Sequence, residues 1–261
     1  MGLFELNPAE FEGFLFVLTR VTAFVLFAPI LGSRQFPVIA KIGFVLMLSL
    51  TVFSGVEPGQ LPQPKSLFGL STFMILELLA GLAIAFATRL VFTAVQIGGT
   101  MVDFQMGFGV VNVIDPQTET QVSVTAQFQN IFALLMYLGL NAHHTTIHAL
   151  VESFHIINPL RFEFAGASAG LLIKLFADTF IVAIKIAAPI MAILFFISVG
   201  LGLVARTVPQ MNVFIVGFPL QIGAGLIMVG LSMSFFGIVI QNQIHKLPGW
   251  NLALLQTFTA P

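Results

Sequence analysis

Apolar residues run through the chain in long blocks that are separated by short polar or turn-forming segments. A membrane-spanning helix needs about 20 consecutive apolar residues. Six blocks approach or exceed that length: roughly 13–31, 36–56, 67–97, 128–151, 167–205 and 211–240. The pattern predicts an all-α, polytopic integral membrane protein made of about six apolar helical blocks.

Two of these blocks, 67–97 and 167–205, are too long for one simple crossing. A helix of that length tilts, extends beyond the bilayer or breaks. Pro189 lies in the second block, and a proline inside a helix removes a backbone donor and kinks the chain. We therefore expect kinked helical hairpins.

The connections between blocks are short, with the exception of residues 98–127. This connection begins with Gly98 and Gly99 and ends in a polar run around Asp115 and Pro116. It is either a loop held inside the protein or a surface connection. We expect a single membrane-embedded domain over residues 1–261, with 98–127 as its internal connection.

Charge is scarce along the chain. The 261 residues include 10 Lys or Arg and 11 Asp or Glu, against a hydrophobic fraction of 57%. A soluble surface needs more charge than this, so the chain must face membrane lipid, other apolar proteins, or both. The net charge of -1 offers no basic patch for phosphate, which excludes nucleic acid as a partner. The absence of cysteine excludes disulfides and thiolate metal sites.

Charged residues inside apolar blocks are candidate functional residues, because each is costly unless it is paired or hydrated. They are Arg20, Glu77, Arg89, Lys174, Asp178 and Lys185. On a helix, Lys174, Asp178 and Lys185 form one polar stripe. The stripe either faces an aqueous path or another subunit, or contains a neutralised Lys174–Asp178 pair with Lys185 reaching an interface.

Histidines form the densest ionisable cluster. His144, His148, Glu152 and His155 lie at helical spacing, which could hold a metal. The zinc-protease pattern requires a Glu directly after the first His, whereas Thr145 follows His144 here. We expect these histidines to mark the hydrated end of a helix, with no metal site. No phosphate-binding loop occurs, and we predict no catalytic residue, no cofactor and no enzymatic activity.

Deformable side chains stand among glycines in the 98–127 connection. Met101, Met106 and Phe108 stand among Gly98, Gly99, Gly107 and Gly109, so the backbone can turn tightly while flexible or bulky groups fill an opening. Such a segment could act as a plug that yields and reseals. The alternative is an ordinary apolar interfacial loop.

Several motifs together resemble the FliR family, whose members are the R subunit of the flagellar type III export gate, with counterparts in virulence secretion. The motifs are AP-x-LGSRQFP-x-x-x-K (Ala28 to Lys41), DFQMGFGVVNVIDP (Asp103 to Pro116), NAHH with a later SF (Asn141 to Phe154) and PQMNVFIVGFPLQI (Pro209 to Ile222). They cover most of the chain in the expected order.

The resemblance implies a structural, channel-forming role. With FliP-like and FliQ-like subunits, and with an FlhB-like subunit nearby, such a protein passes unfolded flagellar subunits across the bacterial inner membrane at the flagellar basal body. The R subunit resembles a joined P-like and Q-like unit of kinked hairpins, much of it above the plane of the bilayer. The resemblance also implies that energy comes from the proton motive force and a separate ATPase.

The family further implies a pore plug, which here falls on Gln105, Met106, Gly107, Phe108, Gly109, Val110, Val111, Asn112, Asp115 and Pro116. These residues would seal the closed pore until an export substrate displaces them. Two other functions remain open at this stage. Buried charges and broken helices also suit a stand-alone small-solute or ion transporter, and the histidine cluster suits a metal-dependent membrane enzyme.

Overall fold

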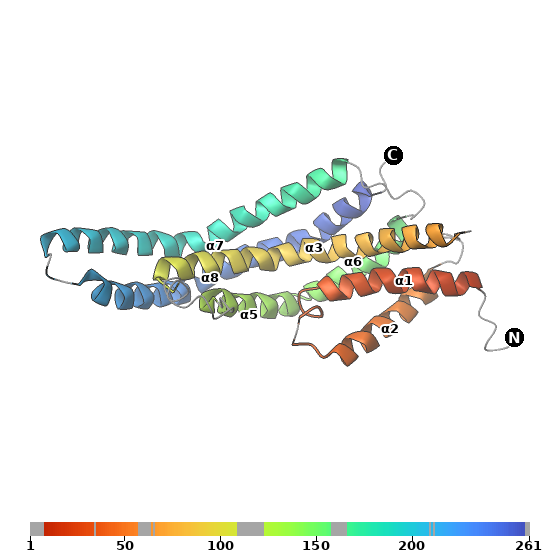
Figure 1. Cartoon of the computed structure of the whole chain (residues 1–261), viewed down its shortest axis with the longest axis horizontal. Coiled ribbons are helices and arrows are strands. Elements are labelled where there is room, and N and C mark those ends of the chain that lie inside the picture. Colours follow the sequence, from red (N-terminus) through yellow and green to blue (C-terminus); the bar gives the residue numbers. More distant parts are fainter. Residues whose placement is uncertain are drawn as a thin grey trace. The chain divides into compact units, whose positions relative to one another are not determined.

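The computed structural model describes residues 8–33, 35–56, 64, 66–108, 123–157, 166–208, 210 and 212–258. Seven α-helices occupy these residues, and no strand occurs among them (Figure 1). They are α1 (Pro8–Phe27), α2 (Val38–Gly55), α3 (Leu67–Met106), α5 (Val124–Gly139), α6 (Ala142–Ile156), α7 (Gly166–Thr207) and α8 (Val213–Thr257). The predicted all-α class is confirmed.

Four of the described helices are long and apolar enough to cross a membrane. They are α2, α3, and the segments Ser168–Thr207 of α7 and Ile215–Thr257 of α8. Helices α5 and α6, with 16 and 15 residues, fall short of the length of about 20 that a crossing needs. The polytopic membrane class is confirmed, with fewer candidate crossings than apolar blocks.

The 128–151 block is divided into two helices. Helix α5 ends at Gly139 and α6 begins at Ala142. Between them, Asn141 adopts a left-handed conformation with φ of 56°. Asn tolerates this region better than most residues that carry a Cβ, so the chain can turn at Asn141 between the end of α5 at Gly139 and the start of α6.

Each of the two overlong blocks forms a single helix. Helix α7 has 42 residues and continues through Pro189, so the break considered from the sequence does not occur there. Helix α3 has 40 residues and continues beyond residue 97 to Met106. The connection predicted over 98–127 is therefore shorter than expected at both ends. It begins after Met106, and α5 already starts at Val124.

The chain divides into two compact units, and α3, α7 and α8 each contribute residues to both. Unit 1 comprises Met1–Leu90, Asn141–Leu175 and His245–Pro261. Its buried core includes Val21, Ile84, Leu150 and Leu254, from four different helices. A Cβ atom on Gly81 would lie 3.0 Å from Cβ of Ala23 and overlap the carbonyl oxygen of Arg20, so α1 and α3 cross in close contact.

Unit 2 comprises Val91–Leu140 and Phe176–Ile244. Its buried core contains residues of α3, α7 and α8: Val102, Met106, Ala187, Ile190, Leu194 and Val229. Nε2 of Gln221 donates to Oγ of Ser198 at 3.0 Å, which joins α8 to α7 by a polar contact. The single functional domain expected over residues 1–261 stays a prediction.

Candidate functional site

The last two turns of α3 lie close to two other helices of unit 2. A Cβ atom on Gly98 would lie 2.9 Å from the carbonyl oxygen of Ala183 in α7. A Cβ atom on Gly99 would lie 2.7 Å from both N and Cβ of Ala126 in α5. The sequence analysis placed both glycines at the start of a connection. They lie inside α3 instead, where a missing side chain permits close helix contact.

Asp103 follows Gly99 by one helical turn and is buried. Its Oδ2 accepts a hydrogen bond from Oγ of Ser123 at 2.5 Å and another from the backbone N–H of Thr125 at 3.2 Å. Ser123 is the N-cap residue of α5, and its Oγ accepts from the N–H of Ala126 at 3.1 Å. We call this set of contacts among Asp103, Ser123, Thr125 and Ala126 the Asp103 clasp.

Met106 is fully buried in the core of unit 2. Cβ on Gly225 of α8 would lie 2.7 Å from Cγ of Met106, so this glycine leaves the space that the methionine fills. The sequence analysis included Met106 among the residues that would fill an opening. The structure shows it packed against α8 as a fixed attachment of the end of α3.

Helix α3 ends in a glycine turn. Gly107 has φ of +94°, a conformation that a residue with a Cβ rarely adopts. Its N–H bonds to the carbonyl of Phe104, and the N–H of Phe108 bonds to the carbonyl of Asp103, each at 3.1 Å. This pair of bonds is the Schellman arrangement. It fixes the direction in which the chain leaves α3.

The predicted plug is only partly within the described residues. Gln105, Gly107 and Phe108 are half-buried there, and Met106 is buried. The others lie outside the described residues: Gly109, Val110, Val111, Asn112, Asp115 and Pro116. The sealing role of this segment stays a prediction, and the structure shows how its two flanks are attached.

The predicted polar stripe lies on α7, with Lys174 and Lys185 exposed and Asp178 half-buried. Lys174 belongs to unit 1, and the other two belong to unit 2. Within the described part of the chain, ion pairs join Arg20 to Glu77 and His148 to Glu152, and none involves the stripe. A neutralised Lys174–Asp178 pair is thus not observed there, and a role in subunit contact stays a prediction.

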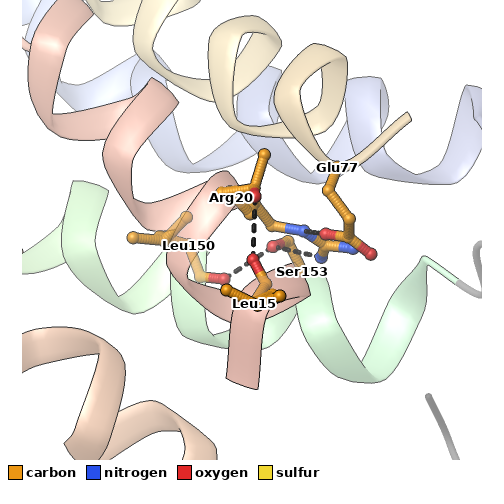
Figure 2. Close-up of polar contacts among 6 residues, drawn as sticks. Leu15, Arg20, Glu77, Leu150 and Ser153 are labelled. Carbon is orange, nitrogen blue, oxygen red and sulfur yellow. Dashed lines mark hydrogen bonds and ion pairs between the residues drawn. The ribbon is translucent and has the colours of Figure 1, made fainter. Parts of the chain in front are cut away.

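A buried charged network joins three helices of unit 1. Nε of Arg20 in α1 lies 2.5 Å from Oε2 of Glu77 in α3, and both side chains are almost completely buried. Nη1 of Arg20 donates to Oγ of Ser153 in α6 at 2.9 Å. The guanidinium also lies 4.0 Å from the ring centroid of Phe154. Figure 2 shows Arg20, Glu77 and Ser153 pointing toward one another.

Arg20 and Glu77 are recognisable in the sequence as intramembrane charges, but their pairing is not, because they are 57 residues apart. Asp103 is not recognisable in this way, because it stands in a segment that the sequence predicts as a connection. One signal was available: Asp103 follows Gly99 by four residues, so both would lie on one face if the helix continued.

The histidine cluster of His144, His148, Glu152 and His155 lies entirely on α6. Nδ1 of His148 lies 3.6 Å from Oε2 of Glu152, and these side chains are 79% and 47% exposed. Among the residues that the structure describes, no group of three or more His, Asp or Glu side chains is placed to hold a metal ion.

Long apolar helices and buried polar contacts define this chain as an all-helical, multi-pass membrane protein. The family model described as "Bacterial export proteins, family 1" matches residues 11–247. The flagellar biosynthetic protein FliR of Bacillus subtilis (strain 168) is 40% identical over 238 residues, which cover 89% of this chain and 90% of that protein. The FliR of Escherichia coli (strain K12) is 30% identical over 217 residues, covering 83% and 82%. The chain therefore belongs to the FliR family of bacterial export proteins, which confirms the resemblance.

Proposed function

We propose that this chain is a channel-forming subunit of the flagellar type III protein export gate, in the bacterial inner membrane at the flagellar basal body. The observation that carries the proposal is similarity to flagellar biosynthetic FliR proteins along nearly the whole chain. The four apolar helices suit a multi-pass membrane location. No observation favours a stand-alone small-solute or ion transporter.

The lengths of the helices support assembly with other proteins. A helix of 40 residues, such as α3, is about 60 Å long at about 1.5 Å per residue. To fit inside a hydrocarbon core of about 30 Å it would have to tilt by about 60°, whereas membrane helices tilt by up to about 40°. Part of α3 therefore lies outside the hydrocarbon, where its exposed apolar side chains need protein to cover them.

The partners that we propose are FliP-like, FliQ-like and FlhB-like subunits of the export apparatus, together with unfolded export substrates in the pore. Helix α2 offers apolar side chains for lipid or subunit contact, since Ile39 and Met47 are 85% and 72% exposed. The polar stripe of Lys174, Asp178 and Lys185 is proposed to face a neighbouring subunit or the channel wall.

The proposed mechanism is passive and non-enzymatic, with no cofactor. Residues of the predicted plug, from Gln105 to Pro116, seal the closed channel, and an arriving export substrate displaces them. The support is the attachment of both flanks within unit 2: Met106 at the end of α3 packs beside Gly225 of α8, and Ser123 at the start of α5 donates to Asp103.

The membership of the complex is tested by purifying the chain from its native membrane in gentle detergent and identifying the proteins that co-purify. We expect a large complex with small membrane proteins of the P and Q types. A lone chain or a homodimer that produces substrate-dependent flux in liposomes would overturn the proposal and support the transporter.

The plug is tested by deleting Val110 to Asn112, a change that leaves Met106 and Ser123 in place. The assembled gate should then leak ions, because side chains that fill the pore are lost while the helices stay packed. Ion flux into vesicles that hold the purified complex measures the effect, and co-purification of the other subunits is the control for assembly. Unchanged flux in a complete complex would contradict the plug.

A further inference from the structure

The described residues on either side of 109–122 meet in unit 2, at the end of α3 and the start of α5. We infer that Asp103 is a positioning residue that holds the first turn of α5 against the last turns of α3. The contact with α5 stands on the structure alone. The consequence for ion flux rests on the proposed function.

Helices α3 and α5 approach each other closely at Gly99. Gly99 lets the backbone of α3 contact Ala126 of α5. Asp103 lies one turn further along the same face of α3, so its carboxyl group arrives beside the exposed backbone N–H groups at the start of α5. A larger residue at position 99 would overlap the backbone of Ala126 and push α5 away from Asp103, which accepts from the N–H of Thr125 at 3.2 Å.

The clasp completes the amino-terminal cap of α5 from a different helix. The first four N–H groups of a helix have no partner within it. Ser123 satisfies the N–H of Ala126, and Asp103 satisfies the N–H of Thr125. A carboxyl group at a helix amino terminus also interacts favourably with the helix dipole. The beginning of α5 is therefore defined by a residue of α3.

Asp103 contributes to both flanks with different atoms. Its carbonyl oxygen accepts from the N–H of Phe108 in the turn that ends α3. Its carboxyl oxygen Oδ2 accepts from Ser123 and Thr125 at the start of α5. One residue thus fixes the point where the chain leaves α3 and the point where it enters α5.

The clasp is incomplete in one respect. Oδ1 of Asp103 is buried and has no hydrogen-bond partner among the described residues. A buried polar atom without a partner costs free energy that the other contacts must offset. The contact between α3 and α5 therefore depends on the two hydrogen bonds to Oδ2, which substitution of Asp103 or Ser123 should weaken.

The first test is hydrogen exchange of peptides that cover the start of α5, measured on the intact purified complex. Asp103→Ala removes both acceptor contacts and should speed exchange of the Thr125 amide on the order of tenfold, since hydrogen bonds to carboxyl groups contribute that factor or more. Asp103→Asn keeps one acceptor oxygen and should give a smaller increase. Unchanged exchange in both variants would overturn the inference.

Ser123 supplies matched variants. Ser123→Ala removes the hydroxyl group and should speed exchange of the Thr125 and Ala126 amides, whereas Ser123→Thr retains a hydroxyl group and should behave like the parent protein. Gln127→Ala changes an exposed side chain in the next turn of α5 and serves as the control. Equal effects of Ser123→Ala and Ser123→Thr would overturn the hydroxyl contact.

The second test measures ion flux through the assembled gate in the same variants. Asp103→Ala and Ser123→Ala should each raise the flux severalfold, and the double variant should add little, because both changes open one contact. If deletion of Val110 to Asn112 raises flux and Asp103→Ala does not, the positioning role is overturned. If neither raises flux while exchange increases in Asp103→Ala, the clasp stands and the plug fails.

Discussion

The two units of the chain hold their helices together with different polar chemistry. In unit 1, Arg20 and Glu77 carry opposite charges, and both are almost completely buried. In unit 2, the buried carboxyl group of Asp103 contacts a hydroxyl group and a backbone N–H. Both carboxyl groups keep one oxygen without a partner among the described residues, Oε1 of Glu77 and Oδ1 of Asp103.

The Arg20–Glu77 pair and the Asp103 clasp differ in the free-energy cost of losing one of their residues. Loss of Arg20 or Glu77 leaves an uncompensated charge in an apolar interior, which is among the most costly changes a protein can undergo. Loss of Ser123 removes a neutral hydroxyl group and creates no new buried charge. Unit 1 is therefore suited to permanent packing of α1, α3 and α6, and the Asp103 clasp to a contact that opens locally.

The largest effect should come from breaking the Arg20–Glu77 pair. Glu77→Ala should lower the free energy of unfolding by about 3–5 kcal/mol, because the Arg20 charge stays buried without its partner. Chemical unfolding of the purified chain in detergent micelles measures the change.

The matched control for that pair removes both charges together. Arg20→Met combined with Glu77→Leu should recover most of the lost stability, since well-packed apolar residues often replace a buried ion pair without loss. A double variant as unstable as Glu77→Ala would show that packing, rather than charge pairing, explains the effect.

A smaller effect is expected where α3 contacts α5. Gly99→Ala places a methyl group against the backbone of Ala126 and should cost about 1–3 kcal/mol of unfolding free energy. Gly230→Ala on α8 meets open space in this chain, so it should be neutral or stabilising by up to about 1 kcal/mol in the isolated protein. Thermal unfolding of both variants in one detergent compares them directly, and equal stability would contradict the close contact.

The smallest effect should follow from the exposed pair on α6. Because His148 and Glu152 are largely solvent-exposed, His148→Ala should change the unfolding free energy by less than about 0.5 kcal/mol. Elemental analysis of the purified complex, before and after this substitution, tests the metal-enzyme alternative at the same site. A stoichiometric metal that His148→Ala removes would revive that alternative.

The all-helical membrane class could be predicted from the sequence because apolar blocks of this length have few other stable forms. The division of 128–151 could not, because an Asn within an apolar block is compatible with a helix as well as with the left-handed conformation that Asn141 adopts. Gly98 and Gly99 were misplaced for a related reason: glycine marks both turns and close helix contacts. Only the neighbours Ala183 and Ala126 decide between these two roles.

The candidate site was predictable in part. The family motifs predicted the position of the plug segment from Gln105 to Pro116. The scarcity of charge in the apolar blocks identified Arg20 and Glu77 as candidate functional residues. The pairing of those two residues depends on contacts between distant helices, which one sequence does not reveal. The clasp depends on α3 continuing past Gly99. Gly98 and Gly99 permit the close helix contact, but in the sequence they indicate the start of a connection, so the contact was not predicted.

The hydroxyl group of Ser123 accepts a hydrogen bond from the N–H of Ala126 and donates one to the carboxyl group of Asp103. Position 123 must therefore accept and donate at one atom on a short side chain, and only the hydroxyl groups of Ser and Thr do both strongly. A carboxylate there would accept from the helix but repel Asp103, and an amide would separate its acceptor from its donor. Random drift at this position should be confined to two of the twenty amino acids, whereas the exposed Gln127 one turn later is free to vary.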